Sequence, residues 1–200
     1  MKIHKNLIPT SFIDQINSAI DKYDYLESLY LFDNGNSTLH NLIRNELTKI
    51  DLFRPNISDA HIVIRCVKPG DKKIANYPHF DNYHHTFVVP VLTPQAPPFG
   101  DLIYAENYRK LPTNVYINAI TKFFYQNPLA KKFIIVNLRH HFSTIHINAG
   151  EVGYFNGLTT LHYNNPVAAE RRSILIHYEN PFKDSTLNKI IEYFGKLNVK

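Results

Sequence analysis

The sequence predicts a mainly β fold with helices at its flanks. Short runs rich in β-branched and aromatic residues recur between residues 60 and 180, separated by Pro, Gly, Asn and Asp, as in strands joined by turns. Helical spacing of apolar residues is found mostly near the two ends of the chain. Several short strands of this kind, with helices outside them, favour a β-sandwich, a barrel or a jelly roll.

Length and composition indicate one globular domain. The chain has 200 residues, of which 44% are hydrophobic and 20% charged, as expected of a folded domain with a sizeable core. Its single cysteine, Cys66, excludes an intramolecular disulfide and is typical of a reducing compartment. No apolar run approaches the ~18 residues of a membrane span, and no signal core precedes Asp14. We therefore expect a cytoplasmic protein without a membrane partner.

Two amphipathic helices are expected before the strands. Residues 10–30 (TSFIDQINSAIDKYDYLESLY) carry apolar side chains three and four positions apart, and Ser11 with Asp14 predicts a capping box at the start. Residues 33–37 (DNGNS) predict a turn. Residues 38–50 (TLHNLIRNELTKI) place Leu and Ile on one face of a second helix. These apolar faces predict that both helices pack on one sheet.

The rest of the chain is expected to hold strands, with a helix at 118–126 (NAITKFFYQ) and another at the C-terminal end (STLNKIIEYFGKL). The strand runs are AHIVIRCV, TFVVPVL, DLIYAE, KKFIIVNL, STIHI, EVGYF and SILIHY. The expected organisation is a single domain over 1–200, with helical support at 1–55, a β core at 60–180 that contains an insertion at 107–149, and a C-terminal helix at 184–198.

The positive surplus of the chain, +5 in all, lies in one segment. Residues 107–149 contain six of the 22 Lys and Arg residues and none of the 17 Asp and Glu residues. One interpretation is a solvated insertion whose lysines face water. The other is a lid whose positive field attracts an anionic small-molecule substrate. The charges are spread out without a recognition motif, so no nucleic acid partner is expected.

A histidine and a carboxylate two residues apart form the first candidate site. In a strand, His79 and Asp81 of PHFDN would point to the same side. They would supply two ligands of a two-histidine, one-carboxylate triad, the set that leaves open positions on non-haem Fe(II). Alone the pair is a weak indication. With 11 His and 17 acidic residues, about one such pair arises by chance, and His177 with Glu179 forms another.

Residues further along the chain strengthen this indication. His162 follows a predicted turn, and Arg171 and Ser173 come soon after it at the start of a strand. On one strand face, an arginine and a hydroxyl can hold a carboxylate through a charge-assisted pair and a further hydrogen bond. The chain thus offers, in order, two metal ligands, a third ligand and a carboxylate clamp.

This arrangement resembles the Fe(II)/2-oxoglutarate-dependent oxygenases. The pattern that carries the resemblance is His79-x-Asp81 followed by His162-x8-Arg171-x-Ser173. The segment HYNNPVAAERRS is similar to that of the isopenicillin N synthase branch, and VKPGDKKIANYPHFDN to that of prolyl-hydroxylase-like members. The matched segments cover residues 62–92 and 150–178. The resemblance implies a double-stranded β-helix, or jelly roll, as the core of the fold.

The resemblance also implies the cofactors and the residues that bind them. The metal ligands for Fe(II) would be His79, Asp81 and His162. Arg171 and Ser173 would hold the distal carboxylate of the co-substrate 2-oxoglutarate. Some relatives place the arginine ten residues after the histidine, which would select Arg172; Arg171 is preferred because it alone shares a strand face with Ser173. A carboxylate among the ligands argues against halogenation, since the halogenating relatives lack it.

We therefore expect an enzyme that uses Fe(II), 2-oxoglutarate and O2 to hydroxylate a small molecule, such as an amino acid or a biosynthetic intermediate, with release of succinate and CO2. One alternative is a peptidyl hydroxylase acting on a protein, which would need an open groove. The other is a non-catalytic jelly-roll binding protein in which the His/Asp pair is incidental. That alternative predicts that neither Fe(II) nor 2-oxoglutarate stabilises the protein and that Asp81→Ala has no effect.

Overall fold

The computed structural model describes residues 1–23, 29–32, 38–70, 77–137 and 139–186. The described strands are β1 (Lys2–His4), β2 (Leu29–Phe32), β3 (His61–Val67), β4 (His85–Leu92), β5 (Leu102–Ala105), β6 (Ser143–Ile145), β7 (Val152–Asn156), β8 (Leu161–Asn164) and β9 (Arg171–Tyr178). The described helices are α1 (Thr10–Ile20), α2 (Thr38–Leu47), α3 (Val115–Gln126) and α4 (Pro128–Asn137), with 3-10 turns η1 (Arg54–Asp59) and η3 (Arg139–His141).

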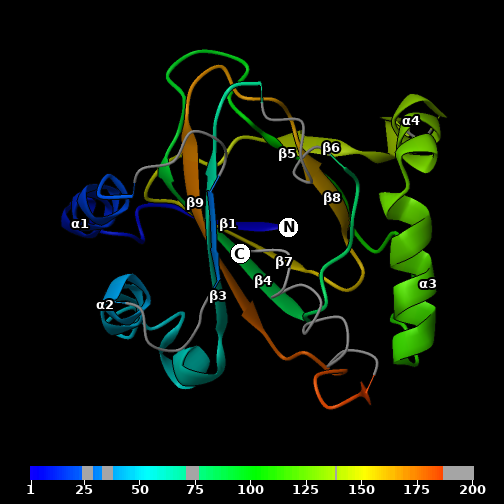
Figure 1. Cartoon of the computed structure of the whole chain (residues 1–200), viewed down its shortest axis with the longest axis horizontal. Helices are drawn as coiled ribbons and strands as arrows, with labels where there is room; N and C mark the ends of the chain where they lie inside the picture. Colours follow the sequence, from blue (N-terminus) through cyan, green and yellow to red (C-terminus); the bar gives the residue numbers. More distant parts are fainter. Residues whose placement is uncertain (24–28, 33–37, 71–76, 138, 187–200) are drawn as a thin grey trace.

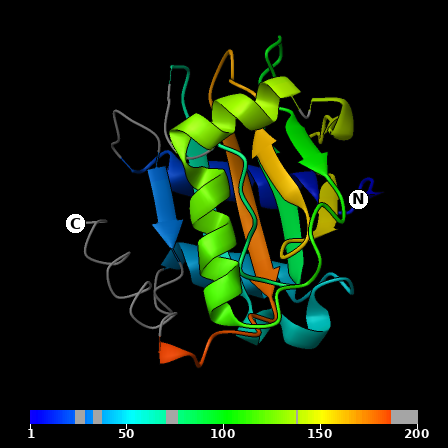
Figure 2. The same ribbon diagram turned by 90° about the vertical axis from the view of Figure 1, so that its right-hand side faces the viewer.

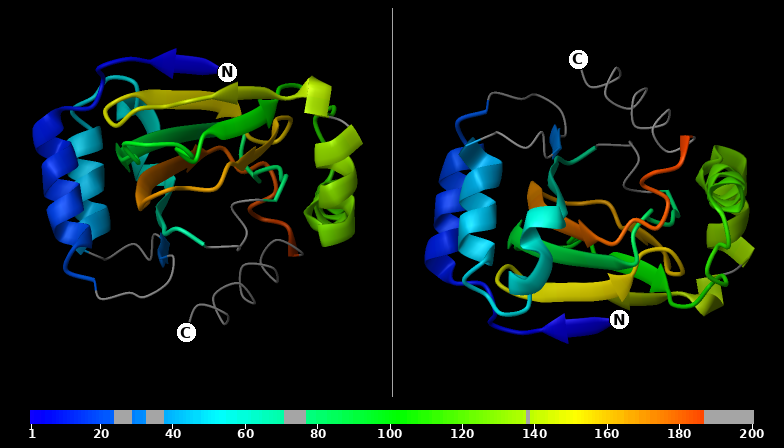
Figure 3. Two further views of the ribbon diagram at one scale, coloured as in Figure 1. Left: turned by 90° about the horizontal axis from the view of Figure 1, so that it is seen from above. Right: turned by 90° about the horizontal axis from the view of Figure 1, so that it is seen from below.

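The strands form two antiparallel sheets. The larger has the order β1-β7-β4-β9-β3-β2 and the smaller the order β6-β5-β8. Helices α1 and α2 lie on one side of the sheets, and α3 and α4 lie on the other (Figure 1). Views from above and below show the same layers (Figure 3). The prediction of a mainly β fold with N-terminal helices on one sheet is confirmed.

Strand alternation divides the side chains of the large sheet between two environments. Ile174 and Ile176 of β9 pack with Phe12 and Ile16 of α1 in the main hydrophobic core. The intervening residues Arg171, Ser173, Leu175 and His177 line a cavity on the opposite face of the strand. On the neighbouring strand β3, Arg65 lines the same cavity while Ile64 and Cys66 belong to the core. One face of the sheet therefore supports the fold and the other carries polar groups.

Helix α1 differs from its prediction at both ends. Its N-cap is Pro9, whose side chain has no acceptor and makes no capping bond. Ser11 lies inside the first turn and is not the N-cap. The predicted capping box is therefore wrong. The helix ends at Ile20 rather than near residue 30, and Leu29–Phe32 instead forms β2, which pairs with β3. The predicted continuation through 24–28 and the turn at 33–37 lie outside the described residues. Helix α2 buries Leu39, Ile43 and Leu47 as expected.

The run KKFIIVNL was predicted to be a strand, and this is wrong: its residues 131–137 lie in helix α4, and residue 138 is outside the described residues. A short apolar run does not by itself distinguish a buried strand from a buried helix. The deciding signal precedes it. Asn127 accepts a hydrogen bond from the backbone N–H of Leu129 through its side chain, and Pro128 occupies the first helical position, which proline favours. Ile134 then packs against Phe80 and Leu161.

Some of the remaining predictions fall on described residues and can be compared with the structure, and others do not. The helix expected at 118–126 is present as α3, which begins three residues earlier because the Asn114 side chain caps it. The C-terminal helix expected at 184–198 lies almost wholly outside the described residues. Strands β1, β2 and β8 were not predicted. Within the described part of the chain, no helix has the length and apolar character needed to cross a bilayer.

Candidate metal centre

His79, Asp81 and His162 meet at the edge of the small sheet. His79 and His162 exchange two backbone hydrogen bonds of 3.0 Å in an isolated antiparallel bridge. The backbone N–H of Asp81 donates to the carbonyl of Gly157 at 3.0 Å. The expected strand over residues 79–81 is only this bridge, yet the alternation holds, since the intervening Phe80 is fully buried on the other side. The backbone therefore fixes the two sequence-distant segments against each other.

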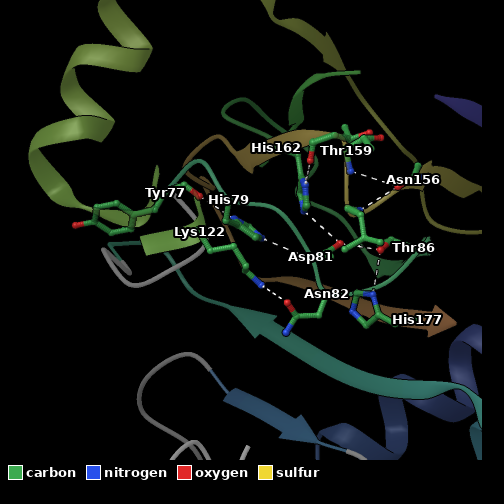
Figure 4. Close-up of polar contacts among 12 residues, drawn as sticks. Tyr77, His79, Asp81, Asn82, Thr86, Lys122, Asn156, Thr159, His162 and His177 are labelled. Atoms are coloured by element: carbon green, nitrogen blue, oxygen red, sulfur yellow. Dashed lines mark hydrogen bonds and ion pairs between the residues drawn. The ribbon is translucent and has the colours of Figure 1, made fainter. Parts of the chain in front are cut away.

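The three side chains present their ligand atoms to one point (Figure 4). The carboxylate oxygens of Asp81 lie 3.9 Å from Nε2 of His79 and 3.7 Å from Nε2 of His162. All three ligand atoms lie within 4.8 Å of one another. Small side-chain rotations bring such atoms into contact with a single ion. Two imidazoles and one carboxylate are the donors that non-haem Fe(II) uses when several coordination positions stay open, so the residues fit that metal.

Backbone carbonyls orient both imidazole rings. Nδ1 of His79 lies 2.8 Å from the carbonyl of Tyr77, and Nδ1 of His162 lies 3.1 Å from that of Thr160. A carbonyl only accepts, so each Nδ1 carries a proton, and in the neutral ring the lone pair is therefore on Nε2. Rings held by hydrogen bonds at the other nitrogen are a regular feature of metal-binding histidines. Both Nε2 atoms thus point inward in the tautomer that a metal requires.

Burial and neighbouring charges set protonation states that suit a metal. Burial lowers the pKa of His79 to about 3, with repulsion from His162 acting in the same direction. Burial alone would raise the pKa of Asp81, but electrostatic attraction to the imidazoles of His162 and His177, and a hydrogen bond from Thr86, outweigh it and hold that pKa below its ordinary value. At neutral pH His79 is neutral and Asp81 ionised. Metal binding therefore displaces no proton from either.

A hydrogen-bonded chain supports the carboxylate from the large sheet. The Thr86 hydroxyl donates to Oδ2 of Asp81 at 2.7 Å, and its oxygen lies 3.1 Å from Nδ1 of His177. Because the Thr86 hydroxyl gives its one hydrogen to Asp81, Nδ1 of His177 donates to the Thr86 oxygen. Burial lowers the pKa of His177 to about 4, so its ring is neutral at neutral pH. His177 also stacks on Tyr83, with ring centroids 4.8 Å apart. The Asp81 carboxylate is therefore held by a rigid chain of donors.

Thr86→Val is expected to weaken metal binding by about 10- to 100-fold while the chain stays folded. Valine fills the same volume but removes the donor to Asp81 and the acceptor for His177. Competition with a chromophoric chelator measures the change. Thr121→Val, which removes a hydroxyl bonded to a carbonyl on the surface of α3, is the matched control. Equal affinity in both variants would show that the hydroxyl does not position the ligand.

Gly157 leaves no room for a side chain beside the triad. A Cβ on this residue would lie 2.7 Å from Cβ of Asp81 and 2.8 Å from the carbonyl oxygen of Tyr83. Gly157→Ala should therefore displace Asp81 and weaken metal binding by about tenfold or more, measured by the same competition. In Gly153→Ala the new Cβ meets the flexible ends of Ile147 and Met1, so this control should bind metal normally. If Gly157→Ala also binds normally, the close contact does not constrain the ligand.

A cavity between the two sheets joins the triad to further polar groups. Its lining includes the triad, Arg65, Asn164, Arg171, Ser173 and His177. The Ser173 hydroxyl is buried and has no hydrogen-bond partner in the described structure, although such groups are nearly always satisfied. The free volume is about 30 Å³, room for one or two waters. A larger occupant requires the lining side chains to rotate, as interface side chains commonly do on binding.

The two neighbouring arginines lie on opposite faces of β9. Arg171 faces the cavity with Ser173, and a Cβ on Gly100 would come within 3.0 Å of its Cδ, so glycine leaves space for it. Arg172 instead pairs with Asp21 at the end of α1 and with Glu170, at 2.6 Å each. Of the two, only Arg171 lines the cavity beside the triad, whereas Arg172 ties α1 to the sheet.

Several residues at this site were not identified from the sequence. These are Arg65, Thr86, Asn164, His177 and, on helix α3, Lys122. His177 was considered only with Glu179, but Glu179 lies beside His85 and does not reach the triad. Arg65 had a readable signal: it interrupts an apolar strand on the face opposite Ile64 and Cys66. The others depend on tertiary packing that spacing does not reveal.

Comparison with solved structures identifies the fold. HygX from Streptomyces hygroscopicus, solved with nickel and 2-oxoglutarate bound, matches with a TM-score of 0.59 at 11% identity, over 90% of this chain and 82% of that one. A prolyl-4-hydroxylase from Pseudomonas putida matches with a TM-score of 0.50 at 10% identity, over 90% and 91%. SnoK, a non-haem α-ketoglutarate-dependent carbocyclase of nogalamycin biosynthesis, matches with a TM-score of 0.52 at 11% identity, over 87% and 77%.

These likenesses show that the chain has the jelly-roll fold of the 2-oxoglutarate-dependent oxygenases, as the sequence resemblance implied. HygX has also been solved with iron bound, and with nickel, 2-oxoglutarate and hygromycin B together. No family model and no curated protein sequence matches the chain.

Proposed function

We propose that this chain is an Fe(II)- and 2-oxoglutarate-dependent dioxygenase that hydroxylates a small molecule, such as an amino acid or a biosynthetic intermediate. The observation that carries the proposal is the convergence of His79, Asp81 and His162. Hydrogen bonds at Nδ1 hold both imidazole rings in the tautomer that binds a metal through Nε2. The shared fold with HygX, which binds 2-oxoglutarate, supports it. Bound iron and 2-oxoglutarate would supply oxidative decarboxylation to succinate and CO2 and the oxidising power for hydroxylation.

The chain's own residues would bind, orient and exclude water. The triad would hold Fe(II) through two imidazole nitrogens and one carboxylate. Arg171 and Ser173, on the same strand face, would hold the distal carboxylate of 2-oxoglutarate by a charge-assisted pair and a hydroxyl hydrogen bond. The orphaned Ser173 hydroxyl would then gain a partner. Arg65, which pairs with Ser173 across β3 and β9, would add a second positive charge to this end of the cavity.

Helix α3 favours a small substrate over a segment of a protein. It lies across the sheets on the side of the triad (Figure 2). Asn118 of α3 donates to the Asn82 side chain at 3.0 Å, directly beside the ligand Asp81. A helix bonded in this way to the ligand loop, the segment that carries Asp81 and Asn82, narrows the approach to the metal. This suits a pocket rather than an open peptide groove. The likeness to HygX, which binds hygromycin B, supports the same choice.

Anaerobic titration tests the proposal. The apoprotein is titrated with Fe(II) and then 2-oxoglutarate while the weak visible charge-transfer band of a keto acid chelated to iron is followed. The wild type should develop the band, and His162→Ala should not. Absence of the band in wild-type protein at saturating ligand would overturn the oxygenase proposal and leave a jelly-roll binding protein.

A further inference from the structure

Lys122 is the cation of helix α3 that turns toward the triad. Its side chain runs from α3 to the ligand loop, where Nζ lies 2.9 Å from Oδ1 of Asn82, the residue after Asp81 (Figure 4). In the described part of the chain, the carboxylate whose charge acts on Lys122 is Asp81 itself. A metal bound by Asp81 would occupy that carboxylate, so Lys122 would keep a charge without a counter-ion beside the reaction centre.

Arg109 places a second cation in the same network. Its Nε donates to the carbonyl of Leu158 at 2.7 Å, and its Nη2 donates to Oδ1 of Asn118 at 2.7 Å. The guanidinium also lies over the Phe80 ring, 3.9 Å from its centroid. These partners are all neutral, and the buried Nη1 has no hydrogen-bond partner in the described structure. Arg109 and Lys122 repel each other electrostatically.

Two partly buried cations whose hydrogen-bond partners are all neutral are costly. Burial lowers the pKa of Lys122 to about 8 and that of Arg109 to about 10, because desolvation disfavours the charged form. Segment 107–149 contains no acidic residue that could compensate. Neutral side-chain amides hold both cations instead: Asn82 accepts from Lys122, and Asn118 accepts from Arg109. Such an arrangement is stabilised when an anion fills it.

We propose that Lys122, supported by Arg109, is the recognition site for a negatively charged group of the substrate, a carboxylate or a phosphoryl group, held beside the metal centre. This inference rests on the proposed function and names its substrate class: a small anionic metabolite. Asn82 would fix the Lys122 amine in place, and Asp81 next to it in the chain would fix the metal. The anion and the oxidised carbon would thereby keep a set separation.

Inorganic phosphate serves as the probe. It is titrated into the anaerobic protein with saturating Fe(II) and 2-oxoglutarate, at an ionic strength held constant with sodium chloride, and the unfolding temperature is followed. The wild type should show a saturable rise. Lys122→Met should raise the midpoint phosphate concentration by about tenfold or more, since removing one partner of a desolvated charge pair has at least that effect. Lys122→Arg should restore most of the binding, and Lys110→Met, at an exposed neighbouring position, should match the wild type.

The 2-oxoglutarate titration of the visible band, run on the same variants, separates this proposal from the proposed function. An unchanged 2-oxoglutarate midpoint in Lys122→Met, with weakened phosphate binding, supports a substrate-anion site. A raised 2-oxoglutarate midpoint overturns it, since Lys122 would then serve the co-substrate. No saturable phosphate effect in the wild type, or the same effect in Lys122→Met, also overturns it. A Lys122-dependent phosphate effect in a protein that never forms the band would leave the anion site standing and refute the oxygenase.

Discussion

Asp81→Ala is expected to lower the affinity for Fe(II) by more than about 100-fold and to abolish 2-oxoglutarate turnover. Asp81 is the anionic member of the triad, between two imidazoles at 3.7 and 3.9 Å. Loss of an outer hydrogen-bond partner already costs about 10- to 100-fold in metal affinity, and loss of a ligand costs more. Two neutral imidazoles remain, without a negative charge to balance a divalent ion. Anaerobic competition with a chelator measures the affinity, and succinate release measures turnover.

Asp101→Ala is the matched control for this prediction. Asp101 also pairs with a histidine, His146, at 2.7 Å, but this pair lies outside the triad. The same chemical change there should leave metal affinity and turnover at the wild-type level. If Asp81→Ala bound Fe(II) as tightly as Asp101→Ala, the triad would not be the metal centre. The non-catalytic binding protein would then be the better interpretation.

The fold could be predicted where one periodicity dominates. From Ser173 to Tyr178, strand β9 alternates between cavity and core, so its type and its two faces could be predicted from the sequence. Helix α4 could not be identified from its apolar run. Only one side of the helix is buried, against Phe80 and Leu161, and this depends on tertiary packing. Strand β2 depends on its pairing with β3. It has only four residues, too few to show an alternation of apolar and polar side chains that would distinguish it from the preceding helix.

The candidate site, like the fold, could be predicted only in part from the sequence. Residue type and spacing, together with the family resemblance, selected His79, Asp81 and His162, and the structure brings their ligand atoms within 4.8 Å of one another. The assignment of binding partners within the site could not follow from spacing. Thr86 reaches Asp81 because β4 runs beside the segment that carries Asp81, and Lys122 reaches the next residue, Asn82, because α3 folds back over that segment. Contacts between segments 40 residues apart are set by the fold, so only coordinates reveal them.

Arg171→Ala is expected to raise the 2-oxoglutarate concentration needed for half-maximal band formation by about 100-fold, with little change in stability. Arg171 faces the cavity beside Ser173 and Asn164, where a guanidinium would pair with the distal carboxylate away from water. Removing one partner of such a pair costs about 2–5 kcal/mol. The affinity for Fe(II) alone should not change, because the triad stays intact. The anaerobic titration gives both values.

Arg172→Ala should give the opposite result, which makes the adjacent residue the sharpest control. Its guanidinium binds Asp21, Glu170 and the carbonyl of Asn17, so its loss loosens α1 from the large sheet. Because Asp21 is largely exposed, the expected destabilisation is about 2 kcal/mol, or roughly 5 °C in Tm. The 2-oxoglutarate midpoint should stay at the wild-type value. If instead Arg172→Ala raised that midpoint and Arg171→Ala did not, β9 would present its other face to the co-substrate, and the cavity between the sheets would not be the binding site.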